Sequence, residues 1–279
     1  MKLLKFTPSE WQTKTGIKIT GMPFISPDSS LNKIIYSCGG WVAGGFVRNA
    51  LLGKEYIDYL SKNGGDIDFF FSSSDAANEA IEKISHINTI QKFEHSIGHA
   101  AMETLVSNNT SLFKIQLVNK PQLCMPNIES SLNIFDIFNA CVAFDGEYFH
   151  VPEGWLELEL QKSLKVLNNN SPILGHRISK YLQQKGLENI CDESISLVED
   201  WLAMCVANKF DHFYNRDQAT VAMKASVMAL FEKKNCKIDR KNILMFIGMW
   251  NVYYNDYTLI DGLQKQDWAL NALASEKEK

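Results

Sequence analysis

The sequence lacks any apolar run long enough to cross a membrane. A spanning helix needs about 18 or more consecutive, mainly apolar residues, and the densest apolar stretch, residues 243–250, is far shorter. The opening residues, MKLLKFTPSE, contain two lysines but no apolar segment behind them, so no secretory signal is expected. We therefore expect a cytoplasmic protein that has no membrane partner.

A dominant charge of either sign is also missing. The 28 Lys and Arg residues nearly balance the 32 Asp and Glu residues, which leaves a net charge of −4 in 279 residues. This charge gives no overall attraction to nucleic acid, although it is compatible with a local basic groove. The apolar content of 46% excludes wholesale disorder, and the length suits one large domain or two modest ones.

Paired cysteine motifs are absent as well. The six cysteines form no CxxC pair and have no regular spacing; they are Cys38, Cys124, Cys141, Cys191, Cys205 and Cys236. The sequence therefore predicts neither a zinc site nor a disulfide framework. Buried free thiols in a reducing cytoplasm are the expected state.

The pattern of the sequence changes near residue 166. Before that point it is rich in glycine, β-branched and aromatic residues, and this part holds the whole net negative charge. Short alternating or apolar stretches there predict strands, and a helix is predicted to begin at Ser74. The predicted strands cover residues 41–43, 66–71, 112–118 and 136–144.

Residues after 166 show helical spacing of apolar side chains instead. Helices are predicted over residues 174–186, 198–206, 219–234 and 241–254. We therefore predict an α+β fold with two domains. A mixed sheet with flanking helices would occupy residues 1–165, and an all-helical region would occupy residues 166–279.

Two aspartates separated by one residue provide the first candidate site. Asp66 and Asp68 lie in the predicted strand DIDFFF, and side chains two residues apart on a strand point to the same face. Magnesium and similar hard cations bind one or two carboxylates together with substrate phosphates. Such a pair suits phosphoryl or nucleotidyl transfer, although two solvated aspartates at a strand end are the alternative interpretation.

A glycine pair upstream of the aspartates provides the second candidate site. Gly44 and Gly45 follow the predicted strand 41–43 and precede a helical stretch. Glycines at such a turn let backbone N–H groups approach an anion closely, and the start of the helix adds a favourable dipole. Arg48 lies one turn further on and would reach the same anion. The alternative interpretation is a tight turn that needs glycine, followed by a solvated arginine.

Together these residues resemble the head of the polymerase-β nucleotidyltransferase superfamily. The similarity is to the class II tRNA nucleotidyltransferase and bacterial poly(A) polymerase branch, which has Gly-Gly-x-Val-Arg-Asp-x-Leu-Leu-Gly followed by Asp-x-Asp. The matching residues are Gly44, Gly45, Val47, Arg48, Leu51, Leu52, Gly53, Asp66 and Asp68. The resemblance implies a nucleotidyltransferase head, Mg²⁺ or Mn²⁺ bound by the aspartates, and a nucleotide held by the glycine turn.

The sequence also departs from the pattern of this branch. Asn49 stands where the branch usually has aspartate, and it is retained here as a candidate nucleotide-binding residue. The linker between Gly53 and Asp66 is longer than the branch leads us to expect. The Glu-Asp-x-x-Arg element that selects CTP and ATP in CCA-adding members is not recognisable.

Asp136 matches a third element of the branch, an Arg-Arg-Asp segment. Here the segment reads Ile134-Phe135-Asp136, so both arginines that help to hold the incoming nucleotide are missing. The resemblance implies that Asp136 acts as a third metal-binding carboxylate beside Asp66 and Asp68. The alternative is that Asp136 caps a helix or starts a strand.

Arg177 and Lys180 loosely match the arginine-rich helix that follows the head in this branch. They lie three residues apart in the predicted helix 174–186, on one side of it. The resemblance implies that they contact the nucleotide or the acceptor. A solvated basic face is the alternative interpretation.

Two functions from different classes follow. The first is a metal-dependent nucleotidyltransferase that moves an NMP from an NTP to a hydroxyl of tRNA or another RNA, a protein or a small molecule. The second is a catalytically inactive nucleotide-binding or interaction protein on the same fold. The loss of the two arginines and the presence of Asn49 favour the second, whereas the retained aspartates, glycines and Arg48 favour the enzyme.

Overall fold

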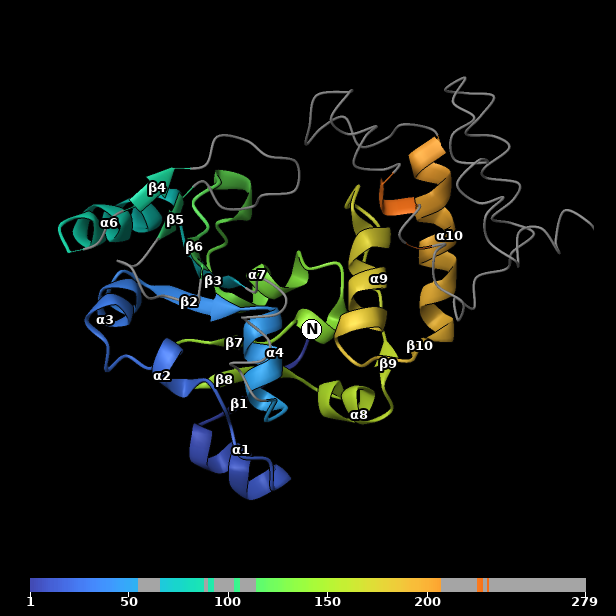
Figure 1. Cartoon of the computed structure of the whole chain (residues 1–279), viewed down its shortest axis with the longest axis horizontal. Helices are drawn as coiled ribbons and strands as arrows, with labels where there is room; N and C mark the ends of the chain where they lie inside the picture. The colour runs from blue at the N-terminus through green and yellow to red at the C-terminus, as the bar shows by residue number, and fades with distance from the viewer. Residues whose placement is uncertain are drawn as a thin grey trace, which may run out of the picture. The chain divides into compact units, whose positions relative to one another are not determined.

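The computed structural model describes residues 1–54, 66–87, 90–92, 103–105, 114–206, 225–227 and 230. The chain forms two compact units (Figure 1). The first contains Met1–Phe135 and Asn139–Trp155, and the second contains Asp136–Phe138 and Leu156–Lys279. The predicted helices over 219–234 and 241–254 fall largely or wholly outside the described residues, and the predicted domains 1–165 and 166–279 stay a prediction.

An eight-stranded mixed sheet forms the centre of the first unit, in the order β1-β8-β7-β2-β3-β6-β5-β4. All neighbours pair antiparallel except β3 and β6, which are parallel. The strands are β1 (Leu3–Phe6), β2 (Gly40–Ala43), β3 (Asp66–Phe71), β4 (Ile90–Lys92), β5 (Glu103–Leu105), β6 (Lys114–Leu117), β7 (Ala143–Phe144) and β8 (Phe149–Pro152). The strands predicted over 41–43 and 66–71 are confirmed, and β6 lies within the strand predicted over 112–118.

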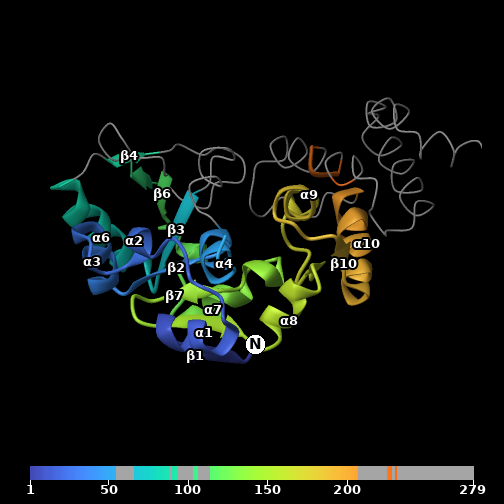
Figure 2. The same ribbon diagram turned by 60° about the horizontal axis from the view of Figure 1, so that its bottom comes forward.

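The apolar face of β2 and β3 is covered by two helices, α3 (Ser30–Ser37) and α6 (Ser74–Ser85). Figures 1 and 2 show these helices side by side. Tyr36 of α3 packs edge-on against Phe69 of β3 at a centroid distance of 6.1 Å. Phe69 and Phe71 are fully buried, and burying each such ring stabilises the fold by about 1.5–3 kcal/mol.

Helix α1 (Pro8–Thr15) is fixed by a capping box and one buried indole. The Thr7 hydroxyl accepts a hydrogen bond from the Glu10 backbone N–H, while the Glu10 carboxylate accepts one from the backbone N–H of Thr7. Trp11 is 2% exposed, and its Nε1 donates to the Leu51 carbonyl at 3.1 Å. This bond ties α1 to the end of α4 (Gly45–Leu51). The other helices in the described part of this unit are α2 (Met22–Ile25) and α7 (Ile128–Asn133), with a short 3-10 turn, η1 (Pro121–Leu123).

The turn between β7 and β8 is stabilised by Asp145. Its Oδ1 accepts hydrogen bonds from the backbone N–H groups of Glu147 and Tyr148, and its Oδ2 lies 2.7 Å from Nε2 of buried His150. Burial raises the pKa of Asp145, but the hydrogen bonds from His150, Tyr148 and Glu147 together lower it further, so the net pKa is below the ordinary value. The ionised carboxylate therefore stabilises this turn.

The second unit contains three named helices, further helical residues at 225–227 and 230, and a short parallel pair of strands. The named elements are α8 (Trp155–Leu160, with its first residue in the first unit), β9 (Ser163–Leu164), α9 (Leu174–Gln184), β10 (Asn189–Ile190) and α10 (Asp192–Val206). Helices α9 and α10 confirm the helices predicted over 174–186 and 198–206. The α+β class is confirmed, with β10 as one short strand in the region that was expected to be all helical.

The strand predicted over 136–144 is wrong for most of its length. Only Ala143–Phe144 is a strand, and Phe138–Ala140 forms a 3-10 turn, η2. The backbone of 136–138 instead bonds to the segment that follows β9: the Phe138 N–H donates to the Lys165 carbonyl, and the Leu167 N–H donates to the Asp136 carbonyl, both at 2.8 Å. These bonds place the tripeptide in the second unit while the chain on either side of it belongs to the first.

Candidate nucleotide and metal site

The two aspartates of β3 share one face of the sheet, as their spacing predicts. Asp66 and Asp68 are both half-buried, whereas the alternate residues Ile67 and Phe69 are fully buried on the other face. Asp68 stands opposite Ala43, the last residue of β2. The carboxylates therefore lie on the strand next to the one that leads into the glycine turn.

This donor set is compatible with magnesium. Two carboxylates from one strand supply the hard oxygen ligands that Mg²⁺ binds, and the remaining positions of such a site are usually taken by water and substrate phosphates. No group of three or more His, Cys, Asp or Glu side chains suitable for a metal occurs among the residues that the structure describes. Within the described part of the first unit, Asp66 and Asp68 are therefore the carboxylates that we assign to the ion.

The turn after β2 requires glycine at its first position. Gly44 has φ 91° and ψ −148°, a conformation that is essentially restricted to glycine. Its N–H donates to the Val142 carbonyl at 3.0 Å, and its carbonyl accepts from the Arg48 N–H at 3.0 Å. Because the Gly44 N–H is already engaged, the N–H of Gly45, the first residue of α4, is the better candidate for contact with an anion.

Arg48 and Asn49 are both buried in the first unit, at 1% exposure each. The alternative of a solvated Arg48 is therefore wrong. Asn49 is unusual, because neither its amide nitrogen nor its amide oxygen has a hydrogen-bond partner within the described part of the chain. A buried amide without partners costs about 1–3 kcal/mol.

Phe135 lies beside the glycine turn, a placement that sequence reasoning missed. Its Cε1 atom is 3.6 Å from the position that a Cβ atom on Gly44 would occupy. Its ring also packs on Phe70, with centroids 5.6 Å apart and planes inclined by 55°. Since Phe70 follows Asp68 by two residues on β3, this contact places Phe135 over the face that carries the aspartates.

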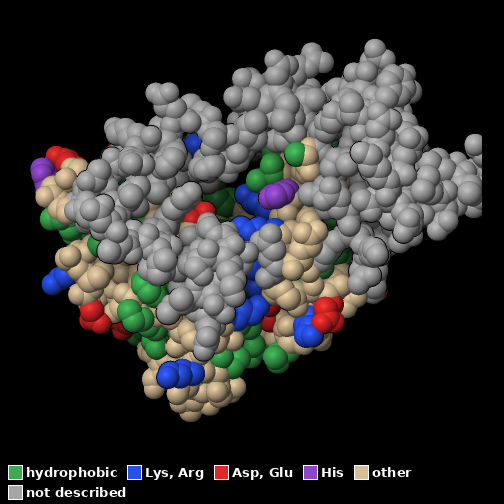
Figure 3. Space-filling view, viewed as in Figure 1, with side chains coloured by type: hydrophobic (Ala, Val, Ile, Leu, Met, Phe, Trp, Pro, Cys, Tyr) green, Lys and Arg blue, Asp and Glu red, His purple; other side chains and the backbone are tan. Residues whose placement is uncertain are grey.

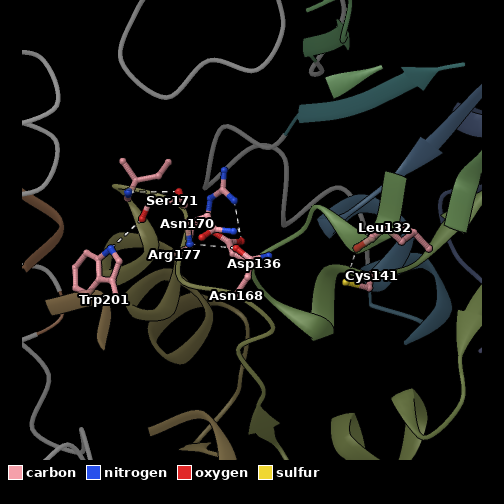
Figure 4. A network of polar contacts seen from close by, with 9 residues as sticks. Leu132, Asp136, Cys141, Asn168, Asn170, Ser171, Arg177 and Trp201 are labelled. Atoms are coloured by element: carbon pink, nitrogen blue, oxygen red, sulfur yellow. Dashed lines mark hydrogen bonds and ion pairs between the residues drawn. The ribbon is translucent and has the colours of Figure 1, made fainter. Parts of the chain in front are cut away.

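Asp136 belongs to the second unit and forms an ion pair with Arg177 of α9 (Figure 4). The Arg177 Nη1 donates to Asp136 Oδ1 at 2.7 Å; the Asp136 side chain is 4% exposed and that of Arg177 is 39% exposed. Within the described residues, Asp136 Oδ2 has no hydrogen-bond partner. Asp136 neither caps a helix nor starts a strand, and its role as a third metal ligand stays a prediction.

Lys180 follows Arg177 by one turn of α9 and is half-buried. The loop before α9 contains further polar contacts shown in Figure 4: the Asn170 N–H donates to Asn168 Oδ1, and Trp201 Nε1 donates to the Ser171 carbonyl at 2.9 Å. The run Asn168-Asn169-Asn170-Ser171 is the sequence signal for such a loop, because Asn and Ser side chains bond to nearby backbone groups. Roles of Arg177 and Lys180 in nucleotide binding stay predictions.

Figure 3 shows charged side chains of both signs on the described part of this face. None of the described helices is both long and apolar enough to cross a membrane.

Comparison with solved structures identifies the class of fold. The chain is similar to a CCA-adding enzyme in complex with ATP (TM-score 0.55, 16% identity, covering 90% of this chain and 56% of that one). It is also similar to a CCA-adding enzyme in apo form I (0.54, 15%, 89% and 55%) and to a tRNA-processing enzyme in apo form I (0.51, 15%, 88% and 59%). The predicted resemblance to a polymerase-β nucleotidyltransferase head is thus confirmed at the level of the fold. The chain spans a little over half of the length of these structures.

The family is identified from the sequence. Residues 23–162, half of the chain, match the profile described as "Gabija anti-defense 2 family protein". The chain belongs to the Gabija anti-defense 2 family. No curated protein sequence matches it significantly.

Proposed function

We propose that this protein is a metal-dependent nucleotidyltransferase. The observation that carries the proposal is the pairing of β2 with β3, which sets Asp66 and Asp68 on one face of the sheet beside the strand that ends at the Gly44–Gly45 turn. The fold is that of CCA-adding enzymes, and a fold alone does not define a function. The carboxylate pair on this fold supports the proposal.

In the proposed reaction, an acceptor hydroxyl attacks the α-phosphorus of an NTP. The new bond joins the acceptor oxygen to that phosphorus, the bond from the α-phosphorus to the bridging oxygen breaks, pyrophosphate leaves, and the hydroxyl proton passes to a base. Mg²⁺ or Mn²⁺ held by Asp66 and Asp68 would lower the pKa of the hydroxyl and neutralise the leaving group. We assign a phosphate contact to the Gly45 N–H, a further one to Arg48 that would require its buried side chain to be uncovered when the nucleotide binds, and a supporting role to Asn49.

The second unit has a proposed positioning role. Arg177 and Lys180 of α9 would contact the base or the acceptor, and Asp136 would act either as a further carboxylate or through its ion pair with Arg177. The region from residue 166 onward would thus hold substrate while the chemistry takes place in the first domain.

Membership in an anti-defense family leads us to propose that the transfer counters the Gabija defence. The acceptor would be an RNA, a protein or a small molecule, and the missing base-selecting element disfavours a housekeeping enzyme that repairs tRNA 3′ ends. An inactive interaction protein is the second candidate function. Asn49 at the usual aspartate position, and Ile134 and Phe135 at the expected arginine positions, favour it.

The test uses the full chain with each α-³²P-labelled NTP, Mg²⁺ or Mn²⁺, and RNA or protein extract as acceptor. The enzyme transfers label to one class of acceptor, and Asp66→Asn and Asp68→Asn abolish the transfer. Asp75→Asn is the matched control, because Asp75 is an exposed aspartate at the start of α6 in the same unit. Equal labelling by wild type and Asp68→Asn would refute the assignment, and the absence of label with every NTP and extract would favour the inactive protein.

A further inference from the structure

The ring of Phe135 lies against two parts of the proposed nucleotide site, the glycine turn and the aspartate strand β3. Its Cε1 atom approaches to 3.6 Å from the Cβ position of Gly44, and its ring packs on Phe70 of the aspartate strand. Trp41 stands opposite Phe70 in the register of β2 and β3. These three aromatic side chains therefore gather on the face that carries Asp66 and Asp68.

The side chains of Phe135 and Ile134 cannot bind phosphate. A phenyl ring carries no positive charge and no hydrogen-bond donor, and the same holds for the side chain of Ile134, which is 37% exposed. An aromatic ring does attract planar bases and the apolar faces of sugars, because stacking removes both surfaces from water and is tolerant of base identity. Phe135 is half-buried, so part of this residue is exposed to solvent.

We infer that Phe135 is a specificity-determining residue that contacts the nucleoside part of the bound NTP, its base or its sugar, and not its phosphates. The inference rests on the proposed function, since it places the nucleotide at the Gly44–Gly45 turn. The Phe135 ring would thus position the NTP through its nucleoside, whereas a cationic side chain at residue 135 would position it through its phosphates.

The test compares the binding of nucleotides with the binding of a phosphate chain that lacks a nucleoside. Titration calorimetry on the full chain with Mg²⁺ uses ATP, GTP, CTP, UTP and sodium tripolyphosphate. Phe135→Leu keeps an apolar side chain of similar size against Phe70 but removes the ring, Phe135→Tyr keeps the ring, and Ile134→Leu serves as the neighbouring control. Melting temperature is recorded for each variant, so that a folding defect is detected.

Phe135→Leu is expected to lower the affinity for the best-bound NTP about tenfold while the affinity for tripolyphosphate is unchanged. Phe135→Tyr and Ile134→Leu should bind both ligands within about twofold of wild type, since neither removes a ring. An equal loss for NTP and tripolyphosphate would show that Phe135 only supports the turn, and unchanged or increased NTP affinity would show that the ring does not contact the nucleoside; either result overturns the inference alone. A wild-type protein that binds no NTP overturns the proposed function, and the inference with it.

Discussion

Removal of the Arg177 guanidinium should destabilise the second unit, because it leaves a buried carboxylate without its counter-charge. The two groups are 2.7 Å apart, and the Asp136 side chain is 4% exposed. Loss of one partner from a fully buried pair costs about 3–5 kcal/mol. Since 39% of the Arg177 side chain is exposed and water already screens it, we expect a smaller loss, about 2–3 kcal/mol, for Arg177→Met.

The assay is urea denaturation followed by circular dichroism, with Lys180→Met as the matched control. Lys180 lies on the same helix and, among the described residues, forms no ion pair, so its replacement should change stability by no more than about 0.5 kcal/mol. The double variant Asp136→Asn with Arg177→Met should recover part of the loss, because the uncompensated charge is gone. Equal effects of Arg177→Met and Lys180→Met, or strict additivity in the double variant, would refute this account of Asp136.

Three further predictions concern the first unit. Asp68→Ala should abolish nucleotidyl transfer because it removes a metal ligand, and it should leave the circular dichroism spectrum unchanged because it also relieves carboxylate repulsion. Residual transfer above roughly 10% of the wild-type rate would contradict this prediction. Gly44→Ala should lower unfolding free energy by about 1–3 kcal/mol because of its positive φ, whereas Gly45→Ala, in a helical position, should cost less in the same denaturation assay. Asp145→Asn should lower the urea midpoint at neutral pH, and its curve of stability against pH should converge with that of wild type in acid. The reason is that folding lowers the pKa of Asp145. The stabilisation by this carboxylate is therefore complete above the unfolded pKa and is lost as pH falls through the folded pKa. Parallel curves down to about pH 2 would contradict this last prediction.

Local patterns in the sequence determined the parts of the structure that depend on near neighbours in the chain. The alternation in DIDFFF predicted a strand with Asp66 and Asp68 on one face, because strand geometry repeats every two residues whatever surrounds it. The Gly44–Gly45 pair predicted the turn into α4, since only glycine adopts the required φ without strain. Apolar spacing likewise predicted α9 and α10. The order of the glycines, the arginine and the aspartates along the sequence also predicted the class of fold.

Tertiary structure decided the features that depend on distant residues. Asp136 is paired with a cation on α9, and the backbone of residues 136–138 bonds to residues after β9, so this part of the predicted strand over 136–144 does not join the sheet. Phe135 reaches Gly44 across 91 positions of the sequence, which no local spacing encodes. Burial of Arg48 follows from how α4 packs, and a helical pattern does not distinguish a solvated arginine from a buried one. In each case the decisive partner lies far away in the chain, and only the folded molecule brings the two together.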